Sequence, residues 1–412
     1  MPEQSPPNIV TVLTDDQGCW ALGCAGNEEI ETPNLDRLAA SGIRFENFFC
    51  TSPVCSPARA SILTGRMPSQ HGVHDWLSGG NTYHEYEQHA GDELIQYLKG
   101  QPGYTDYLAE TGYTCGFSGK WHMGDSHHPQ KSFTFWETHA KGGGPYYNAP
   151  MVDGERVRIE PRYVTDVVTD NALKFLESRT TEENPFYLSV HYTAPHSPWS
   201  RENHPDETFD RYYEECPFRS VPQQTPHPWV REGLFPHSVD ARRSALSGYY
   251  AAVTEMDRNV GRLLDWLEEN GFRDNTWIIF LSDNGMNMGH HGIYGKGNGT
   301  YPMNMYDTSV KIPALMSWPD VIEAGRVCDS ILSQYDLMPT ILQAAGTHDP
   351  QGDELPGSSF MHLLEGAPET EERGAVFVYD EYGPVRMIRT DEWKYVHRYP
   401  YGPNELYDLA ND

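Results

Sequence analysis

The chain has 412 residues, of which 38% are hydrophobic and 12% aromatic, enough apolar material for one large domain with a smaller appendage. Its 59 Asp and Glu residues against 30 Lys and Arg give a formal net charge of −29, which argues against nucleic acid and anionic membranes as partners. No apolar run is long enough to span a bilayer. The sequence does not indicate an oligomeric state.

The beginning of the chain is polar and rich in proline, and it lacks the hydrophobic region of a signal peptide. We therefore expect a cytoplasmic protein as the sequence stands, or a periplasmic or secreted one if a leader has been removed. The seven cysteines are an odd number and contain no CxxC pair, so they indicate neither a disulfide scaffold nor a zinc site.

Short β-branched runs alternate with amphipathic stretches, which predicts an α/β fold with a mainly parallel sheet flanked by helices. In chain order, the predicted elements are strand Asn8–Leu13, a helix from Pro33 closed by Gly42, a helix from just after Cys55 to about Leu63, helix Tyr104–Glu110, strand Tyr113–Ser118, helix Pro161–Ser178, strand Phe186–Tyr192, a long helix at Ala241–Asn270, strand Thr276–Leu281, strand Ile312–Ser317 and a helix at Ser333–Ala345. Thr32 is the predicted N-cap of the first helix, and Ser333 and Asp336 form a predicted capping pattern.

After about Gly374 the predicted elements are strands without helices, at Ala375–Tyr379, Val385–Arg389 and Trp393–His397. We read this part as a small antiparallel sheet. The expected division is a catalytic α/β domain at residues 1–365 and a small C-terminal subdomain at 366–412.

Polar clusters follow the predicted strands at the point where each strand ends. They are Asp15-Asp16, Lys120 with His122, His196, and Asp283-Asn284. Ligands of open α/β sheets bind outside the carboxyl ends of the strands, so we expect these side chains to share one cleft.

Adjacent carboxylates at a strand end repel each other unless a cation lies between them. Asp15 and Asp16 form one such pair, and Asp283 with Asn284 supplies further oxygen ligands. An all-oxygen set favours Ca²⁺ or Mg²⁺ over zinc. Either pair by itself could merely cap a turn, but two pairs after two strands favour a metal site.

Cys55 precedes Pro57, which suits the first turn of a helix, so Cys55 is placed where backbone N–H groups stabilise an anion. Arg59 lies four residues further along and can project from the same helix. A buried cysteine beside a surface arginine and a thiolate nucleophile are both open interpretations of this segment.

The segment Cys55-Ser56-Pro57-Ala58-Arg59, followed by Leu63-Thr64-Gly65-Arg66, resembles the sulfatase signature C-x-P-x-R with its downstream L-T-G-R. The resemblance extends from Asn8 to Asp408. It implies that a maturation enzyme oxidises Cys55 to formylglycine, whose hydrated aldehyde is the nucleophile. It also implies Ca²⁺ ligands at Asp15, Asp16, Asp283 and Asn284 with modified Cys55 close by, and catalytic or sulfate-binding roles for Arg59, Lys120, His122, His196 and Lys296.

The resemblance further implies the fold of the alkaline phosphatase superfamily, with a large mixed, mostly parallel sheet and a small C-terminal sheet. In relatives the stretch around Asp408 is usually followed by a further helix, which leaves room for a truncation here. Within the site, the cation, Arg59, Lys120 and Lys296 are expected to stabilise sulfate charge. His196 is the expected acid for the leaving alcohol, with Lys296 as the alternative, and His122 is the expected base for release of sulfate.

The expected reaction is hydrolysis of a sulfate ester, most simply of a sulfated sugar, with aryl or alkyl sulfates still open. A phosphodiester or phosphonate monoester hydrolase is the nearest alternative, because members of that superfamily share the fold and the motif. A two-zinc phosphatase would need further Asp and His ligands. A glycan-binding module without turnover would require that Cys55 is never converted. The sulfated position and exo or endo action do not follow from the sequence.

Several histidines invite a metal interpretation that we do not adopt. His71 and His74 are spaced by three residues but lie in a glycine-containing segment without an extra ligand set. The pairs His127-His128 and His290-His291 are expected to shape the pocket mouth or touch substrate instead.

Overall fold

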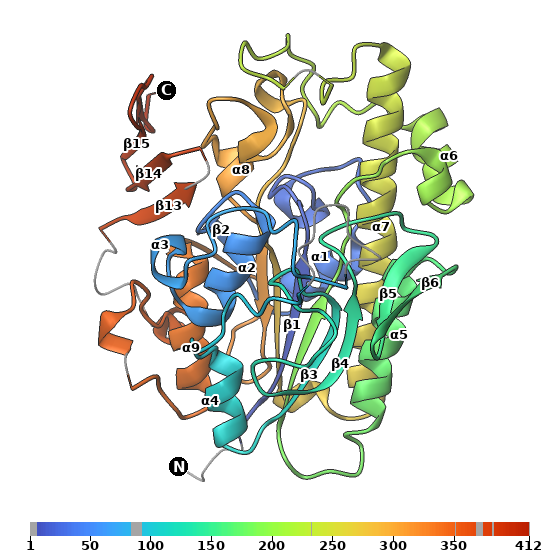
Figure 1. Ribbon diagram of the computed structural model, residues 1–412, viewed down its shortest axis with the longest axis vertical. Coiled ribbons are helices and arrows are strands. Elements are labelled where there is room, and N and C mark those ends of the chain that lie inside the picture. Colours follow the sequence, from blue (N-terminus) through green and yellow to red (C-terminus); the bar gives the residue numbers. More distant parts are fainter. Residues whose placement is uncertain are drawn as a thin grey trace.

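A mixed ten-stranded sheet runs through the centre of the computed structural model (Figure 1), which describes residues 6–83, 93–231, 233–350, 352–367, 374–380 and 383–411. The strands β1, β7, β8, β3 and β4 at its centre are parallel, as are β2 and β12, whereas β11, β5 and β6 run antiparallel to their neighbours. This confirms the expected mixed, mostly parallel sheet. The spatial order is β12 (Arg326–Ser333), β2 (Ile43–Phe49), β11 (Ala314–Ser317), β8 (Thr276–Ser282), β1 (Asn8–Thr14), β7 (Phe186–His191), β3 (Thr114–Lys120), β4 (Phe133–His139), β5 (Ala149–Asp153) and β6 (Arg156–Glu160).

Helices cover both faces of this sheet. One layer holds α1 (Pro33–Ala40), α5 (Val164–Glu177), α6 (Asp206–Glu215) and the long α7 (Val239–Glu269), and the other holds α2 (Cys55–Thr64), α3 (Pro68–His71), α4 (Tyr104–Glu110), α9 (Leu337–Ala344) and α10 (Met361–Leu364). Successive residues of a strand point to opposite faces, and in β1 Ile9 and Leu13 join one core while Val10 and Val12 join the other. Both faces of the sheet are therefore buried, which explains why the central strands are mostly apolar.

Four further strands form the small antiparallel sheet, in the order β13 (Val376–Asp380), β14 (Val385–Arg389), β15 (Trp393–Arg398) and β16 (Glu405–Asp408). Its buried residues Val376 and Val378 belong to the same core cluster as Ile9 of β1. The backbone N–H of Tyr379 also donates to the carbonyl of Thr51, 2.8 Å away, in the segment before α2. The small sheet is thus packed on the layer that carries Cys55, and the domain boundary at residue 365 stays a prediction.

Most predicted elements are observed within a few residues of their expected bounds, but some details differ. Thr32 occupies the N-cap position of α1 without capping it, because its hydroxyl accepts from Gly23 N–H and donates to Asp36. The expected helix at Ser333–Ala345 begins as a 3-10 turn, Gln334–Asp336, and Asp336 accepts from the N–H of Ser333 as predicted. The strands β2, β4, β5, β6, β12 and β16 were not predicted.

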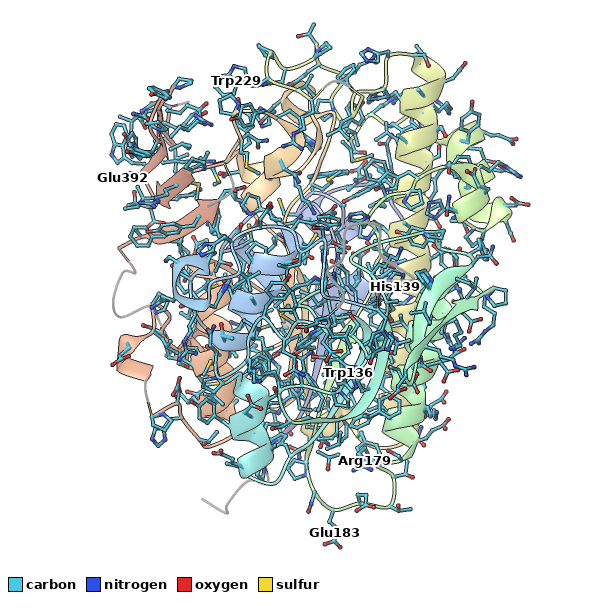
Figure 2. The ribbon with its side chains drawn as sticks, viewed as in Figure 1. Trp136, His139, Arg179, Glu183, Trp229 and Glu392 are labelled. Carbon is cyan, nitrogen blue, oxygen red and sulfur yellow. The ribbon has the colours of Figure 1, made fainter. Side chains whose placement is uncertain are left out.

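Side chains fill the space between the layers (Figure 2). Trp136 and His139 of β4 lie within the body of the molecule, whereas Glu183 and Trp229 lie at its opposite ends. No helix in the described part of the chain has both the length and the apolar character that a membrane span requires.

Candidate active site

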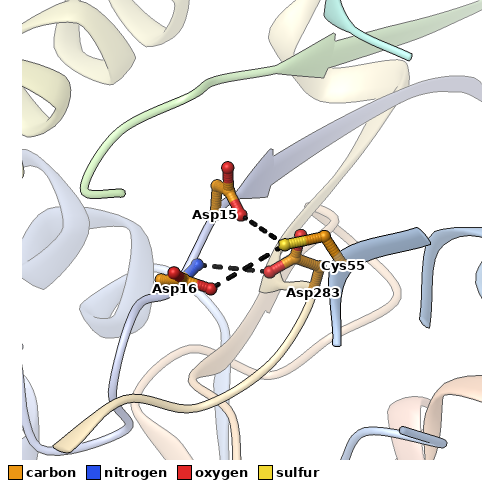
Figure 3. Close-up of side chains that lie close together, drawn as sticks. All are labelled: Asp15, Asp16, Cys55 and Asp283. Carbon is orange, nitrogen blue, oxygen red and sulfur yellow. Dashed lines mark hydrogen bonds between the residues drawn. The ribbon is translucent and has the colours of Figure 1, made fainter. Parts of the chain in front are cut away.

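Three carboxylates and one cysteine converge at the carboxyl ends of β1 and β8 (Figure 3). Asp15 and Asp16 follow β1 directly, Asp283 follows β8, and Cys55 is the first residue of α2. One ligand atom from each of the four lies within 4.8 Å of the others, and all four residues are buried. Parallel pairing of β1 with β8 brings the ends of these strands together although 267 residues separate Asp16 from Asp283.

Backbone and amide groups fix the orientation of these carboxylates. Asp283 Oδ1 accepts from the backbone N–H of Asp16 at 3.2 Å and from that of Asn284 at 2.8 Å. The Asn284 side chain donates to Asp16 Oδ1 at 2.8 Å. Asp16 itself adopts a φ of +63°, which turns the chain sharply after β1. These hydrogen bonds hold the two strand ends together. We call the group formed by Asp15, Asp16, Asp283 and Asn284 the acidic cup.

Each carboxylate of this cup has a buried cationic partner. Lys120 Nζ lies 2.5 Å from Asp15, Lys296 Nζ lies 2.5 Å from Asp16, and Arg59 Nε lies 2.9 Å from Asp283. Buried charges need such compensation because desolvation would otherwise be too costly.

The pairing shifts the acid–base properties of the carboxylates and the lysine. Burial raises the pKa of the Asp15 carboxyl, but Lys120 opposes it, and the net pKa lies below the ordinary value. For Asp283, burial is likewise outweighed, chiefly by Arg59, and the pKa is lowered. Burial lowers the pKa of Lys296, but Asp16 and Cys55 raise it well above the ordinary value. The cup is thus held as charged pairs.

Cys55 lies among these charges at the start of α2. Its Sγ is 3.2 Å from Asp15 Oδ1, 4.0 Å from Asp16 Oδ1 and 2.8 Å from Lys296 Nζ. Burial, followed by the Asp15 carboxylate, raises the pKa of the Cys55 thiol well above its ordinary value, although Lys120 and Lys296 act in the opposite direction. The helix N-terminus thus does not make Cys55 a thiolate, and this environment argues against the simple thiolate interpretation.

Arg59 connects α2 to the ends of two strands. Besides its pair with Asp283, its guanidinium donates to the carbonyl of Lys120 at 2.9 Å and lies 3.4 Å from Nδ1 of His191. The interpretation of Arg59 as a surface arginine is wrong, because Arg59 is buried. Within the described residues, no hydrogen bond joins Arg59 to Cys55, so its effect on Cys55 is electrostatic.

Two histidines lie beside the cup. His122 is buried with a φ of +54°, its Nε2 lies 3.2 Å from the carbonyl of Leu77, and its Nδ1 has no hydrogen-bond partner among the described residues. Burial lowers the pKa of His122 well below its ordinary value, so the ring is neutral. His196 is partly exposed, with Nδ1 2.7 Å from the carbonyl of Ser197 and Nε2 3.7 Å from Asp16 Oδ2.

A loop of three glycines lies against both rings. A methyl group added at Gly142 would come within 2.2 Å of the His122 ring, and one at Gly143 within 3.1 Å of the His196 ring. Only a residue without a side chain therefore fits between the loop and His122.

The residues that the sequence analysis predicted as metal ligands or catalytic groups lie in or beside the acidic cup. His127, His128, His290 and His291, expected at the pocket mouth, do not line the cavity beside it. Two participants were not predicted, His191 and Gln334, both buried. Gln334 donates to the carbonyl of Asp283 at 2.7 Å and accepts from the N–H of Thr51 at 3.0 Å, which ties β8 to the segment before Cys55. Gln334 follows strand β12, and recognising that strand in the sequence would have pointed to it.

The histidines set aside as metal ligands take other roles. His71 is buried with Nε2 3.0 Å from Ser61 Oγ of α2, and the two nitrogens of this ring are both used locally. His128 pairs with Asp125 at 2.9 Å, and the ring of His291 stacks on Tyr306 at 4.0 Å. None of them belongs to the acidic cup.

The residues of the cup fit a hard divalent cation. Asp15, Asp16 and Asp283 present carboxylate oxygens, and Oδ1 of buried Asn284 has no hydrogen-bond partner among the described residues. An amide oxygen without a partner beside three carboxylates is the ligand set that Ca²⁺ or Mg²⁺ prefers.

A cavity of about 420 Å³ opens directly beside the cup. Asp16, His196 and Lys296 line this cavity, as do Trp199, Met286 and Tyr294. Its volume lies within the usual range for a small-molecule site.

The sulfatase family model matches residues 7–347, which include every residue of the cup. The chain belongs to the sulfatase family. A second model, for the C-terminal part of N-sulphoglucosamine sulphohydrolase, matches residues 289–412 of this sulfatase. The chain is accordingly a sulfuric ester hydrolase of the alkaline phosphatase-like fold.

Characterised relatives resemble this sulfatase over most of its length. The N-acetylglucosamine-6-O-sulfatase of Bacteroides thetaiotaomicron is 28% identical over 100% of this chain and 82% of its own. The N-acetylgalactosamine-6-sulfatase of Canis lupus familiaris is 28% identical over 89% of this chain and 67% of its own.

Solved structures show the same fold. A putative sulfatase from Bacteroides fragilis has a TM-score of 0.81 and 26% identity, covering 100% of this chain and 91% of that one. A protein solved in complex with its substrate D-glucosamine-2-N,6-O-disulfate has a TM-score of 0.77 and 26% identity, covering 98% of this chain and 92% of that one. The phosphonate monoester hydrolase of Agrobacterium radiobacter, 20% identical with a TM-score of 0.72 over 98% and 90%, shares the fold.

Proposed function

We propose that this sulfatase releases sulfate from a sulfated carbohydrate, using a formylglycine made from Cys55 and one bound divalent cation, Ca²⁺ or alternatively Mg²⁺. The observation that carries the proposal is the position of Cys55, whose Sγ faces Asp15, Asp16 and Lys296, and two of these residues, Asp16 and Lys296, line the open cavity. The intact Cys55-Ser56-Pro57-Ala58-Arg59 motif supports conversion by a formylglycine-generating maturation enzyme.

Asp15, Asp16, Asp283 and Asn284 would hold the cation, with the modified side chain at position 55 next to it. When bound, the cation would supply Lewis-acid polarisation of a sulfate oxygen, and a hydrated formylglycine at position 55 would supply the nucleophilic hydroxyl and a second hydroxyl for sulfate release. A serine or cysteine at this position would lack the second hydroxyl.

The cationic side chains serve the sulfate group. The ammonium groups of Lys120 and Lys296 lie at the cup and can each donate to a sulfate oxygen. Arg59 stays bound to Asp283 and the Lys120 carbonyl, so it holds the carboxylate and the lysine in place and adds positive charge. Preorganised positive charge at developing negative charge is a large contribution to catalysis.

The two histidines suit two different proton transfers. His196 lines the cavity with Nε2 facing Asp16, where it can donate a proton to the departing alcohol, and Lys296 is the alternative donor. His122 is neutral, and its Nδ1 has no hydrogen-bond partner in the described part of the chain, so it suits the acceptance of a proton from the second hydroxyl at position 55 during release of sulfate.

Relatives support a carbohydrate substrate. Their names specify N-acetylglucosamine-6-O-sulfate and N-acetylgalactosamine-6-sulfate chemistry, an ulvan-active sulfatase of Formosa agariphila, and a complex with D-glucosamine-2-N,6-O-disulfate. Within the cavity, the partly buried Trp199 offers an apolar face of the kind that packs on a sugar ring.

The test is to co-express wild type and Cys55→Ala with a formylglycine-generating enzyme and to assay both on an aryl sulfate and a panel of sulfated sugars. Wild type should release sulfate, Cys55→Ala should not, and mass spectrometry of the Cys55 peptide should show the aldehyde only in wild type. A phosphodiester and a phosphonate monoester complete the panel. If wild type cleaves those and no sulfate ester, the proposed substrate class is wrong.

A further inference from the structure

The cavity beside the cup contains an arginine that none of the roles above uses. Arg231 lines the cavity together with Asp16, His196 and Lys296. It therefore lines the same open cavity as three of the groups that would surround the sulfate ester. If the ester that is cleaved lies at Asp16 and Lys296, Arg231 is a further cationic group of the same cavity, available to another part of the substrate.

Backbone hydrogen bonds fix Arg231 relative to the site. Its N–H donates to the carbonyl of Gly299 at 3.1 Å, and the N–H of Gly299 donates to the carbonyl of Lys296 at 2.9 Å. Its own carbonyl accepts from Leu234 at 3.2 Å, which closes a turn. Two backbone hydrogen bonds thus link Arg231 to Lys296, so the main chain that carries the guanidinium is fixed relative to this lysine.

Arg231 differs from the other cations of the site in its partners. Lys120, Lys296 and Arg59 each have a carboxylate partner within 2.9 Å. For the side chain of Arg231, no hydrogen bond or ion pair is found among the described residues. The charge of Arg231 acts on the carboxyl of Asp75, although the two residues form no ion pair. Burial raises the pKa of Asp75, and the positive charge of Arg231 opposes this rise.

A guanidinium without a partner among the described residues is notable on a chain with a net charge of −29, where carboxylates are plentiful. A planar guanidinium binds sulfate or carboxylate through two parallel hydrogen bonds. The alternative is that Arg231 is an ordinary surface arginine without a function. Its place in the lining of the cavity, together with Asp16, His196 and Lys296, argues against this alternative.

We propose that Arg231 binds a second anionic group of the substrate, so that the preferred substrate is a sugar bearing a second sulfate or a carboxylate besides the ester that is cleaved. This inference rests on the proposed function and narrows its substrate class. The cavity has space for a sugar whose cleaved sulfate lies at the cup and whose second anion lies at Arg231.

The experiment compares three matched substrates: one sugar with a single sulfate ester, the same sugar with a second sulfate, and the same sugar with a carboxylate. Wild type should show a higher kcat/KM for at least one doubly charged substrate. Arg231→Met should lower that kcat/KM by about 10- to 100-fold, mainly through KM, and should remove most of the preference over the single ester. Arg231→Lys, which keeps the charge but not the paired hydrogen bonds, should fall between.

Exposed Arg219, outside the cavity, supplies the control. Arg219→Met should change none of the three rates, which separates binding at Arg231 from a general loss of positive charge. Equal kcat/KM for all three substrates in wild type, or a preference that survives Arg231→Met, would overturn the inference while leaving the sulfatase activity established. Absence of sulfate release from every substrate would instead count against the proposed function. The doubly sulfated and carboxylated arms show which second anion is preferred.

Discussion

At the scale of single residues, the position of the His122 ring depends on residue 142 having no side chain. A methyl group at Gly142 would lie 2.2 Å from Cε1 and Nε2 of that ring. The ring has little freedom to move away, because it is buried, lies 3.2 Å from the Leu77 carbonyl and packs edge-on against Trp76 at 5.8 Å. Position 142 therefore sets the position of His122.

We expect Gly142→Ala to displace His122 and to lower kcat about 100-fold, because displacements of about 1 Å in a catalytic group have effects of this size. Gly144→Ala is the matched control, since its methyl group would lie 3.6 Å from the His139 ring, an ordinary contact. Steady-state kinetics and thermal unfolding of both variants check this. Equal activity of the two variants, or a loss of Gly142→Ala activity explained by unfolding, would refute the positioning role.

At the scale of secondary-structure elements, α2 carries Cys55 and Arg59 and is held by its neighbours. His71 of α3 lies with Nε2 3.0 Å from Ser61 Oγ on α2, while its Nδ1 accepts from the N–H of Val73 at 3.1 Å. Only a neutral ring can accept at Nδ1 and donate at Nε2. Burial, followed by the charge of His74, lowers the pKa of His71 to about 3.

This pKa shift predicts how stability depends on pH. The folded pKa lies below the unfolded value of about 6.5, so the unfolded state takes up the proton first. The contribution of His71 is complete above about pH 6.5 and decreases by about 1.4 kcal/mol per pH unit as the pH falls toward 3.

Chemical denaturation at several pH values, on wild type and His71→Gln, measures this contribution. The variant should be less stable at pH 7.5 but should lose stability more slowly on acidification. Exposed His362, changed to Gln, should reproduce the wild-type pH dependence. Parallel pH curves for wild type and His71→Gln would show that the His71 ring is not held neutral.

At the scale of the whole molecule, the acidic cup joins segments from distant parts of the chain. Asp15 and Asp16 come from β1, Cys55 from α2, and Asp283 and Asn284 from the end of β8. A cation held there would connect both sheet strands to the helix layer above them. Its binding energy would therefore stabilise the entire domain and not only one loop.

We expect Ca²⁺ to raise the unfolding temperature and EDTA to lower it. When the ion is present at 100 times its dissociation constant, its binding should raise the free energy of unfolding by about 2.7 kcal/mol. Asp16→Asn should remove most of this shift, because it removes a ligand carboxylate. Asp210→Asn on the surface of α6 should retain it. Thermal unfolding with Ca²⁺, Mg²⁺ and EDTA checks this, and a full Ca²⁺ shift in Asp16→Asn would show that the ion binds elsewhere.

The sequence by itself determined the family and the central strands, and it grouped Asp15, Asp16, Cys55 and Asp283, which the structure brings together. The Cys55 motif is local, and β1, β7 and β8 are mostly apolar segments followed by polar residues, so both features could be recognised without a structure. Parallel strands place their carboxyl ends at one edge, which is why residues far apart in the chain could be grouped correctly.

Only the tertiary structure decided how the site residues are paired. Which cation neutralises which carboxylate, the contact of Gly142 with His122, and the shared cavity of Arg231 and Lys296 all depend on packing between distant segments. The strands β2 and β12 contain partly buried residues, so their sequences lack the apolar pattern of the central strands. Gln334 contacts the site only because β12 places it beside Asp283. Local sequence encodes strand ends and turns, whereas ion pairs and cavities arise from contacts that chain order does not specify.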